Sequence, residues 1–126
     1  MAKTRILLVD DEKGFLDIMK QRIEFWGYEV IAVSNGKKAI NVVRKRKTDI
    51  VILDYMMPGM DGVSTLKEIR KFNSHISVIM FTAYIDERAV IGAEKLGVIA
   101  FIPKFNAGSS AESKLKIALQ MAEKKF

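Results

Sequence analysis

The sequence predicts an α/β fold in which five parallel β-strands alternate with five α-helices. Short runs of β-forming residues bounded by turn residues recur along the 126-residue chain. Apolar residues at helical spacing follow each run. Strands joined by helices pair in parallel through right-handed crossovers, and a chain of this length typically forms one domain.

The strands are predicted at residues 6–9, 29–33, 50–53, 78–81 and 99–102. The first helix follows the first strand, and Gly27 is a natural end for it. Its stripe at helical spacing consists of Phe15, Ile18, Met19, Arg22, Ile23 and Trp26.

The other four helices are predicted from polar residues that can cap a helix and from the apolar positions after them. The candidate caps are Ser34 or Asn35, then Asp61, then Asp86, and finally Ser109, which forms a Ser-x-x-Glu capping box with Glu112. The apolar positions are Ala39, Ile40 and Val43; Val63, Leu66 and Ile69; Ala89, Val90 and Ala93; and Leu115, Ala118, Leu119 and Ala122.

Polar residues gather where the predicted strands end. Asp10 and Asp11 follow the first strand, Asp54 the third, Thr82 the fourth, and Lys104 lies just beyond the fifth. Functional residues of open parallel sheets collect at these carboxyl ends, and crowded carboxylates are costly unless a positive charge lies among them. Mg²⁺ prefers oxygen ligands, while a hydroxyl and an ammonium suit phosphate oxygens. The set predicts metal-assisted phosphoryl transfer onto a carboxylate.

These residues, together with the segment Asp54-Tyr-Met-Met-Pro-Gly-Met-Asp-Gly that ends at Gly62 and the pair Thr82-Ala83, carry a family resemblance. The chain resembles the receiver domain of two-component response regulators over nearly its whole length. The resemblance implies a doubly wound, flavodoxin-like (βα)5 sheet with strand order 2-1-3-4-5. One receiver domain is expected over residues 1–126, and no output domain is expected, because only residues 124–126 follow the fifth predicted helix.

The resemblance assigns the phosphoryl acceptor and the Mg²⁺ ligands. Asp54 is expected to be the nucleophile that accepts the phosphoryl group. Asp11 is expected to bind the metal directly and Asp10 mainly through a metal-bound water. Asp54 and the backbone carbonyl of Met56 complete the expected metal site.

The resemblance also assigns a switch. Lys104 is expected to contact Asp54 at rest and a phosphoryl oxygen afterwards, and Thr82 to hydrogen-bond the phosphoryl group. Phe101 stands where the family places its switch aromatic, and we favour that role, although strand alternation also allows a core position. The family often has a proline directly after the lysine, but Phe105 follows Lys104 here. We expect this peptide bond to be trans, because a cis bond without proline is costly.

The function implied is a phosphoryl-accepting switch that shows at most self-phosphorylation from small donors and self-dephosphorylation. A sensor histidine kinase or phosphotransfer protein is the expected donor. An unknown downstream protein would read the surface from helix four through helix five, and the chain would be a monomer or a phosphorylation-dependent dimer. One alternative is a phosphate-independent interaction module. A less favoured one is a phosphotransferase of the haloacid-dehalogenase type, which needs an aspartate where Met56 stands.

Composition excludes several further kinds of site and protein. The chain has no cysteine and therefore no disulfide or thiolate metal site. No apolar stretch reaches the ~20 residues of a membrane span, and a cleaved signal peptide would remove Asp10 and Asp11, so a cytoplasmic location is expected by elimination. The net charge is +6, and the densest basic run is 44–47. Without interleaved aromatics it reads as a solvated helix end, and direct nucleic-acid binding is not expected.

Overall fold

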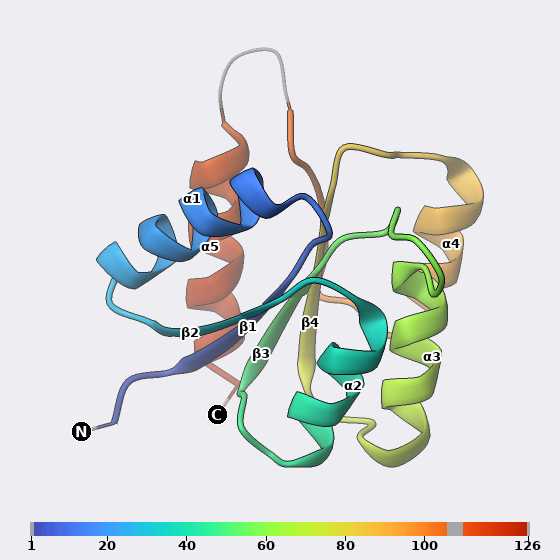
Figure 1. The fold of residues 1–126 in the computed structure, drawn as a ribbon, viewed down its shortest axis with the longest axis horizontal. Helices are drawn as coiled ribbons and strands as arrows, with labels where there is room; N and C mark the ends of the chain where they lie inside the picture. The colour runs from blue at the N-terminus through green and yellow to red at the C-terminus, as the bar shows by residue number, and fades with distance from the viewer. Residues whose placement is uncertain (1, 106–109, 126) are drawn as a thin grey trace.

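The computed structural model describes residues 2–105 and 110–125, in which five strands alternate with five helices (Figure 1). In chain order the elements are β1 (Arg5–Val9), α1 (Lys13–Phe25), β2 (Glu29–Val33), α2 (Gly36–Arg44), β3 (Ile50–Leu53), α3 (Gly62–Phe72), β4 (Ser77–Thr82), α4 (Glu87–Lys95), β5 (Ala100–Pro103) and α5 (Ala111–Glu123).

The five strands form one parallel sheet in the order β2-β1-β3-β4-β5, which confirms the predicted doubly wound fold. Val9 pairs with Leu53, and Leu53 pairs with Met80. This register places the carboxyl ends of β1, β3 and β4 side by side. The residues that follow these strands therefore meet at one edge of the sheet.

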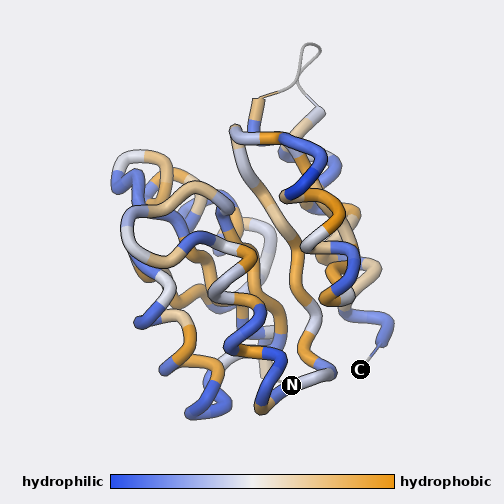
Figure 2. Tube along the Cα trace, turned by 90° about the vertical axis from the view of Figure 1, so that its right-hand side faces the viewer, coloured by the Kyte–Doolittle hydropathy of each residue, from blue (hydrophilic) through white to orange (hydrophobic). Residues whose placement is uncertain are grey.

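Alternating strand side chains build two apolar cores, one on each face of the sheet. Ile6, Leu8 and Ile52 belong to the core under α1 and α5, whereas Leu7, Val9 and Val51 belong to the core under α2, α3 and α4. Figure 1 shows these two groups of helices on opposite sides of the strands. Figure 2 shows apolar colour along the strands and polar residues along the outer turns of the helices. Both cores fix the strands that carry the site.

Short polar side chains begin several helices. Asn35, Asp61 and Asp86 accept hydrogen bonds from backbone N–H groups in the first turns of α2, α3 and α4, as predicted. Glu12 caps α1 by accepting from the N–H groups of Gly14 and Phe15, which the sequence did not suggest.

Helix α5 differs from the prediction. It has Ser110 in the N-cap position, without a side-chain capping bond. Ser109 of the predicted capping box lies outside the described residues. Glu112 instead pairs with Arg22 of α1, at 2.6 Å between Oε1 and Nη1.

Two predictions of detail need correction. Strand β5 begins and ends one residue later than predicted. Ile18 was placed on the buried stripe of α1, yet its side chain is 55% exposed, while Leu16 is buried. Residues two apart point about 200° away from each other on a helix, so α1 cannot bury both. Within the described ranges, no helix combines the length and apolar character that crossing a bilayer requires.

Candidate functional site

The five candidate residues lie at the carboxyl edge of the sheet. Asp10 and Asp11 follow β1, Asp54 follows β3, Thr82 ends β4, and Lys104 follows β5. Backbone hydrogen bonds extend the strand pairing past these ends. The Asp54 N–H donates to the Val9 carbonyl at 3.0 Å, and the Lys104 N–H donates to the Thr82 carbonyl at 2.9 Å. The strand-end prediction from sequence therefore brings these residues together.

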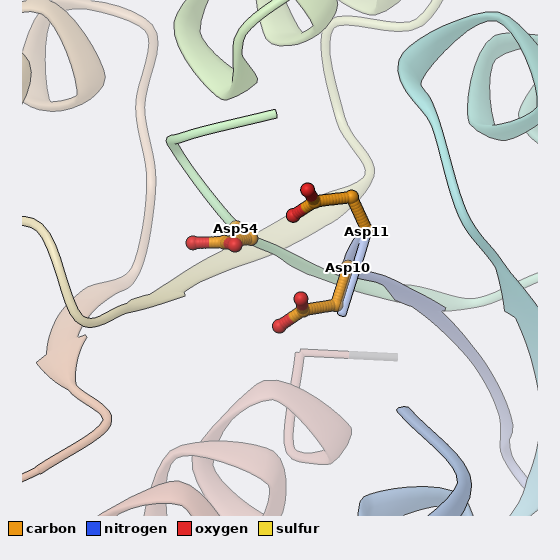
Figure 3. Close-up of side chains that lie close together, drawn as sticks. All are labelled: Asp10, Asp11 and Asp54. Atoms are coloured by element: carbon orange, nitrogen blue, oxygen red, sulfur yellow. The ribbon is translucent and has the colours of Figure 1, made fainter. Parts of the chain in front are cut away.

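The three carboxylates form one cluster. Each of Asp10, Asp11 and Asp54 offers an oxygen atom within 4.8 Å of the others. Figure 3 shows the three side chains gathered at the ends of β1 and β3. Asp10 and Asp54 are only 2% and 5% exposed, whereas Asp11 is exposed. The cluster is thus buried on one side and open to solvent on the other, which gives an incoming ligand access.

Lys104 supplies the positive charge in this cluster. Its ammonium forms ion pairs with Asp10 and with Asp54, the second at 3.3 Å between Nζ and Oδ2. The contact with Asp54 was expected from the family resemblance, but the contact with Asp10 was not. The ammonium also lies 4.3 Å from the centre of the Phe15 ring, in a cation–π arrangement. Only 7% of the lysine side chain is exposed, so its charge acts in a poorly screened environment.

Burial raises the pKa of Asp10 above its usual value. The hydrogen bonds that its carboxylate accepts from Lys104 and from the Glu12 N–H oppose this rise, and the nearby charge of Asp54 adds to it. One ammonium therefore only partly offsets the cost of keeping neighbouring carboxylates ionised. The cluster would be stabilised by further positive charge.

The donor atoms fit a hard divalent cation. The carboxylate oxygens of the cluster are the type of ligand that Mg²⁺ prefers. Met56 lies in the loop between β3 and α3, and no described protein group donates a hydrogen bond to its carbonyl oxygen. Asp11 is exposed and is not among the described ion pairs. These oxygens could hold a metal ion without losing a protein partner.

The loop after Asp54 is shaped by close packing. The Asp54 Oδ1 accepts a hydrogen bond from the Tyr55 N–H at 2.8 Å, and the Gly62 N–H donates to the Tyr55 carbonyl at 2.7 Å. A Cβ atom on Gly62 would lie 2.2 Å from the Asp54 carbonyl oxygen. No side chain fits there, so Gly62 allows α3 to begin directly against the backbone of Asp54.

Thr82 connects the site to the segment that follows β4. Its side chain is fully buried, and its hydroxyl oxygen accepts a hydrogen bond from the Tyr84 N–H at 3.1 Å. The Tyr84 ring stacks on the Tyr55 ring with a centroid distance of 5.4 Å and an interplanar angle of 14°. A hydrogen bond to Asp86 raises the pKa of Tyr84. Sequence reasoning missed this stack, although both tyrosines follow neighbouring strands.

Phe101 lies in β5 opposite Met80 and packs, half-buried, against the core under α2, α3 and α4. This position is compatible with both readings given by the sequence, a switch residue and a core residue. The described part of the chain has no cis peptide bond, so the Lys104–Phe105 bond is trans, as predicted.

Comparison with known sequences gives a consistent set of relatives. Residues 6–116 match the family model of the response regulator receiver domain. Sporulation initiation phosphotransferase F from Bacillus subtilis is 33% identical over 104 residues, which cover 82% of this chain and 84% of the relative. A probable transcriptional regulator, ycf27 from Pyropia yezoensis, is 36% identical over 122 residues. That match covers 97% of this chain, which spans about half the length of ycf27 and the similar regulators it matches.

Solved structures agree with these relatives. A CheY-like receiver domain protein from Methanospirillum hungatei has a TM-score of 0.87 at 28% identity, over 99% of this chain and 100% of that one. The response regulator TrrA from Thermotoga maritima, solved in complex with Mg²⁺-BeF, has a TM-score of 0.77 at 31% identity, over 90% and 96% of the two chains. The chain therefore belongs to the response regulator receiver domain family, the phosphoacceptor domains of two-component signalling.

Proposed function

We propose that this chain is a phosphoryl-accepting switch in which Asp54 is the acceptor. The observation that carries the proposal is the set of contacts around this side chain. Asp54 is 5% exposed, shares a cluster with the carboxylates of Asp10 and Asp11, and is paired with Lys104. A carboxylate held in this way is a nucleophile of the aspartyl-phosphate type.

The donor is a phosphohistidine of a sensor histidine kinase or of a phosphotransfer protein. An oxygen of Asp54 forms the new O–P bond while the N–P bond of the donor breaks, and the released imidazole takes up a proton from solvent. The Lys104 ammonium exchanges its contact with the Asp54 carboxylate for a contact with an equatorial phosphoryl oxygen. The Thr82 hydroxyl donates a hydrogen bond to another of these oxygens. Positioning and charge stabilisation account for most catalysis of this reaction class.

Asp10, Asp11, Asp54 and the Met56 carbonyl would hold Mg²⁺. The ion would offset repulsion among the carboxylates and neutralise charge on the incoming phosphoryl group. Support comes from the oxygen-only donor set and from the Mg²⁺-BeF complex of the Thermotoga maritima relative. Asp11 would bind directly, since its side chain is open to solvent.

Phosphorylation would shift the protein toward a second conformer. Thr82 and Lys104 would turn toward the phosphoryl group, and Phe101 would pack inward with them. The surface from α4 through α5 would change for a downstream protein partner. A shift of this kind involves a coupling free energy of ~1–3 kcal/mol.

The test is intact-mass analysis after incubation with Mg²⁺ and a small phosphodonor such as acetyl phosphate. Wild type should gain one acid-stable, base-labile phosphoryl group, and Asp54→Ala should gain none. Asp17→Ala is the matched control, because Asp17 is an exposed aspartate of α1 outside the cluster. Chelation of Mg²⁺ should suppress the reaction. Wild-type incorporation by Asp54→Ala would reject the acceptor assignment, and a wild type that takes up no phosphate would favour a phosphate-independent interaction module.

A further inference from the structure

Strands β1, β3 and β4 begin at the opposite edge of the sheet (Figure 1). A cavity of about 500 Å³ opens there between the loop that joins α2 to β3 and the loop that joins α3 to β4. Its lining includes Arg5, Arg44, Arg46, Phe72, Asn73 and His75. The basic run noted in the sequence thus contributes to a concave surface.

Arg44 is held in place by an aromatic side chain. Its guanidinium carbon lies 4.8 Å from the centre of the Phe72 ring, a cation–π contact that holds the group near α3. The N–H groups around the edge of a guanidinium placed in this way stay free to bind a planar or tetrahedral oxyanion with two hydrogen bonds. The contact with Phe72 therefore places the Arg44 charge beside the cavity.

Arg46 occupies a backbone position that favours glycine. Its φ is 56°, and it is the one non-glycine residue with a positive φ in the described part of the chain. The Arg46 N–H donates to the Val43 carbonyl and the Lys47 N–H to the Val42 carbonyl, which together form the Schellman motif that ends α2. Glycine serves this motif at lower conformational cost. The backbone gains nothing from an arginine here, so its side chain is the feature to explain.

Arg5 braces the same loop rather than adding free charge. It donates to both carboxylate oxygens of Asp49, at 3.2 and 3.0 Å, and to the Arg46 carbonyl at 3.1 Å. Because Asp49 offsets the charge of Arg5, the excess positive charge of the cavity comes from Arg44 and Arg46. Across the cavity, the Asn73 side-chain oxygen accepts from the His75 and Ile76 N–H groups, which fixes the orientation of the amide.

We propose that this cavity binds a small polyanion, a molecule with two or more phosphate or carboxylate groups, through Arg44 and Arg46. The recessed shape favours a small molecule over a nucleic-acid backbone, which needs an extended basic face. The site lies at the other end of the strands from Asp54 and does not depend on the phosphoryl-acceptor proposal.

Binding of inorganic pyrophosphate and, separately, of citrate to the full chain tests this proposal. The measurement is the change in amide ¹H–¹⁵N NMR shifts in Mg²⁺-free buffer of fixed ionic strength. Shifts should saturate and concentrate at the two loops, with pyrophosphate preferred if the natural ligand carries phosphates and citrate preferred if it carries carboxylates. Arg44→Gln and Arg46→Gly should each weaken binding of the preferred anion about tenfold, the effect expected for one charge-assisted hydrogen bond. Asp54→Ala should bind as wild type does.

Lys45→Gln is the matched control, because Lys45 carries the same charge in the same run without lining the cavity. It should change the affinity less than twofold. Arg46→Gly should also melt at or above the wild-type temperature, since glycine relieves the positive φ. Equal losses of affinity in Lys45→Gln and Arg44→Gln would mean that the anion responds to the overall positive charge and not to a defined site, which would overturn the proposal. So would a lack of saturation with both anions, a lower melting temperature with unchanged affinity in Arg46→Gly, or a glutamate-rich peptide that binds more tightly than either anion.

Discussion

Lys104 is the residue on which the resting arrangement of the site depends most. Its ammonium joins two buried carboxylates, those of Asp10 and Asp54, which come from different strands. Burial already raises the pKa of Asp10, so removal of this ammonium would leave two neighbouring acids without a compensating charge. A phosphoryl group arriving at Asp54 would draw Lys104 toward itself and away from Asp10. We therefore expect the Asp10–Lys104 contact to be weakened once Asp54 is phosphorylated.

Met56 lies two residues beyond Asp54, the proposed acceptor, and Tyr84 lies two residues beyond Thr82. Hydrolysis of an aspartyl phosphate needs a water in line behind the phosphorus. Both side chains are bulky and partly exposed, and Tyr84 is held by its stack on Tyr55. We expect Met56→Asn and Tyr84→Ala each to speed loss of phosphate without preventing phosphorylation, and the double variant to be faster than either. About 1 kcal/mol of lost barrier corresponds to roughly a fivefold faster decay.

The measurement is first-order decay of purified phosphoprotein at constant Mg²⁺ concentration. Phe25→Ala, which truncates an exposed aromatic at the far end of α1, is the control and should decay as wild type does. Unchanged or slower decay in all three site variants would leave Met56 and Tyr84 with a packing role only.

The loop that leads from β3 into α3 depends on close backbone packing at Gly62. A Cβ there would lie 2.2 Å from the Asp54 carbonyl oxygen and 2.9 Å from the Tyr55 Cα. Gly62→Ala should lower the free energy of unfolding by about 2 kcal/mol, a typical cost of overpacking, and should slow phosphorylation because the acceptor moves.

Urea unfolding and intact-mass kinetics measure the two effects of Gly62→Ala. Gly14→Ala is the control, since its Cβ would meet only the flexible Glu12 side chain, at 3.2 Å, and alanine favours a helix. Equal stability of the two variants would show that the loop yields without cost.

At the opposite edge, Asp49 and Arg5 connect the start of β1 to the residue before β3. Hydrogen bonds from the Arg5 side chain hold the pKa of Asp49 below its usual value. The folded state thus binds this proton less tightly than the unfolded state does. The stabilisation is complete above the ordinary aspartate pKa of about 3.9 and is lost as the pH falls through the depressed value.

Asp49→Asn should therefore lower the free energy of unfolding by about 1 kcal/mol at pH 7, allowing for the partial exposure of the pair. The gap to wild type should narrow as the pH falls from 7 to about 3, because the carboxyl then begins to protonate. Urea titrations at both pH values measure it, with Asp17→Asn, at an exposed aspartate of α1, as a surface control expected to stay within about 0.5 kcal/mol. An equal gap at both pH values would contradict the ion-pair account.

At the scale of the whole molecule, sequence patterns predict the strands of the sheet better than they predict the side-chain contacts at its edge. Apolar runs bounded by turn residues predicted each strand to within a residue or so, because a buried parallel strand needs such a run. The burial of Ile18 was wrongly predicted, because one apolar residue beside a helical stripe does not reveal which face of the helix packs against the sheet. The Asp10–Lys104 pair and the Tyr55–Tyr84 stack depend on strand register and side-chain rotamers, and neither leaves a pattern in the sequence.

The two edges of the sheet also differ in charge. The carboxyl edge carries the buried acids, and the amino edge carries Arg44 and Arg46. The overall charge of +6 therefore gives no indication of the local electrostatic potential at the cluster of three aspartates. Strands β3 and β4 connect the two edges through side chains that are almost entirely buried. A conformational change at one edge would reach the rest of the molecule through these strands or through the loops beside them.

Thr82 is the residue through which we expect phosphorylation to affect the surface from α4 through α5. Its hydroxyl accepts the Tyr84 N–H at 3.1 Å and has a proton left to donate to a phosphoryl oxygen. Thr82→Val keeps the branched shape and removes this link. With Mg²⁺ and beryllofluoride as a phosphoryl mimic, the variant should still bind at Asp54, while amide shift changes at residues 84–86 and at Phe101 should fall to less than half of the wild-type values.

Thr48→Val is the matched control for this prediction. It also removes a buried hydroxyl, one that donates to the Arg5 and Ile50 carbonyls at the opposite edge of the sheet. Each variant should lose about 1 kcal/mol of stability, the usual net worth of such a hydrogen bond. Only the Thr82 variant should uncouple Phe101 from Asp54, because only its hydroxyl is hydrogen-bonded to the segment before α4. Full-size shifts at Phe101 in Thr82→Val would mean that the change travels through Lys104 and β5 instead.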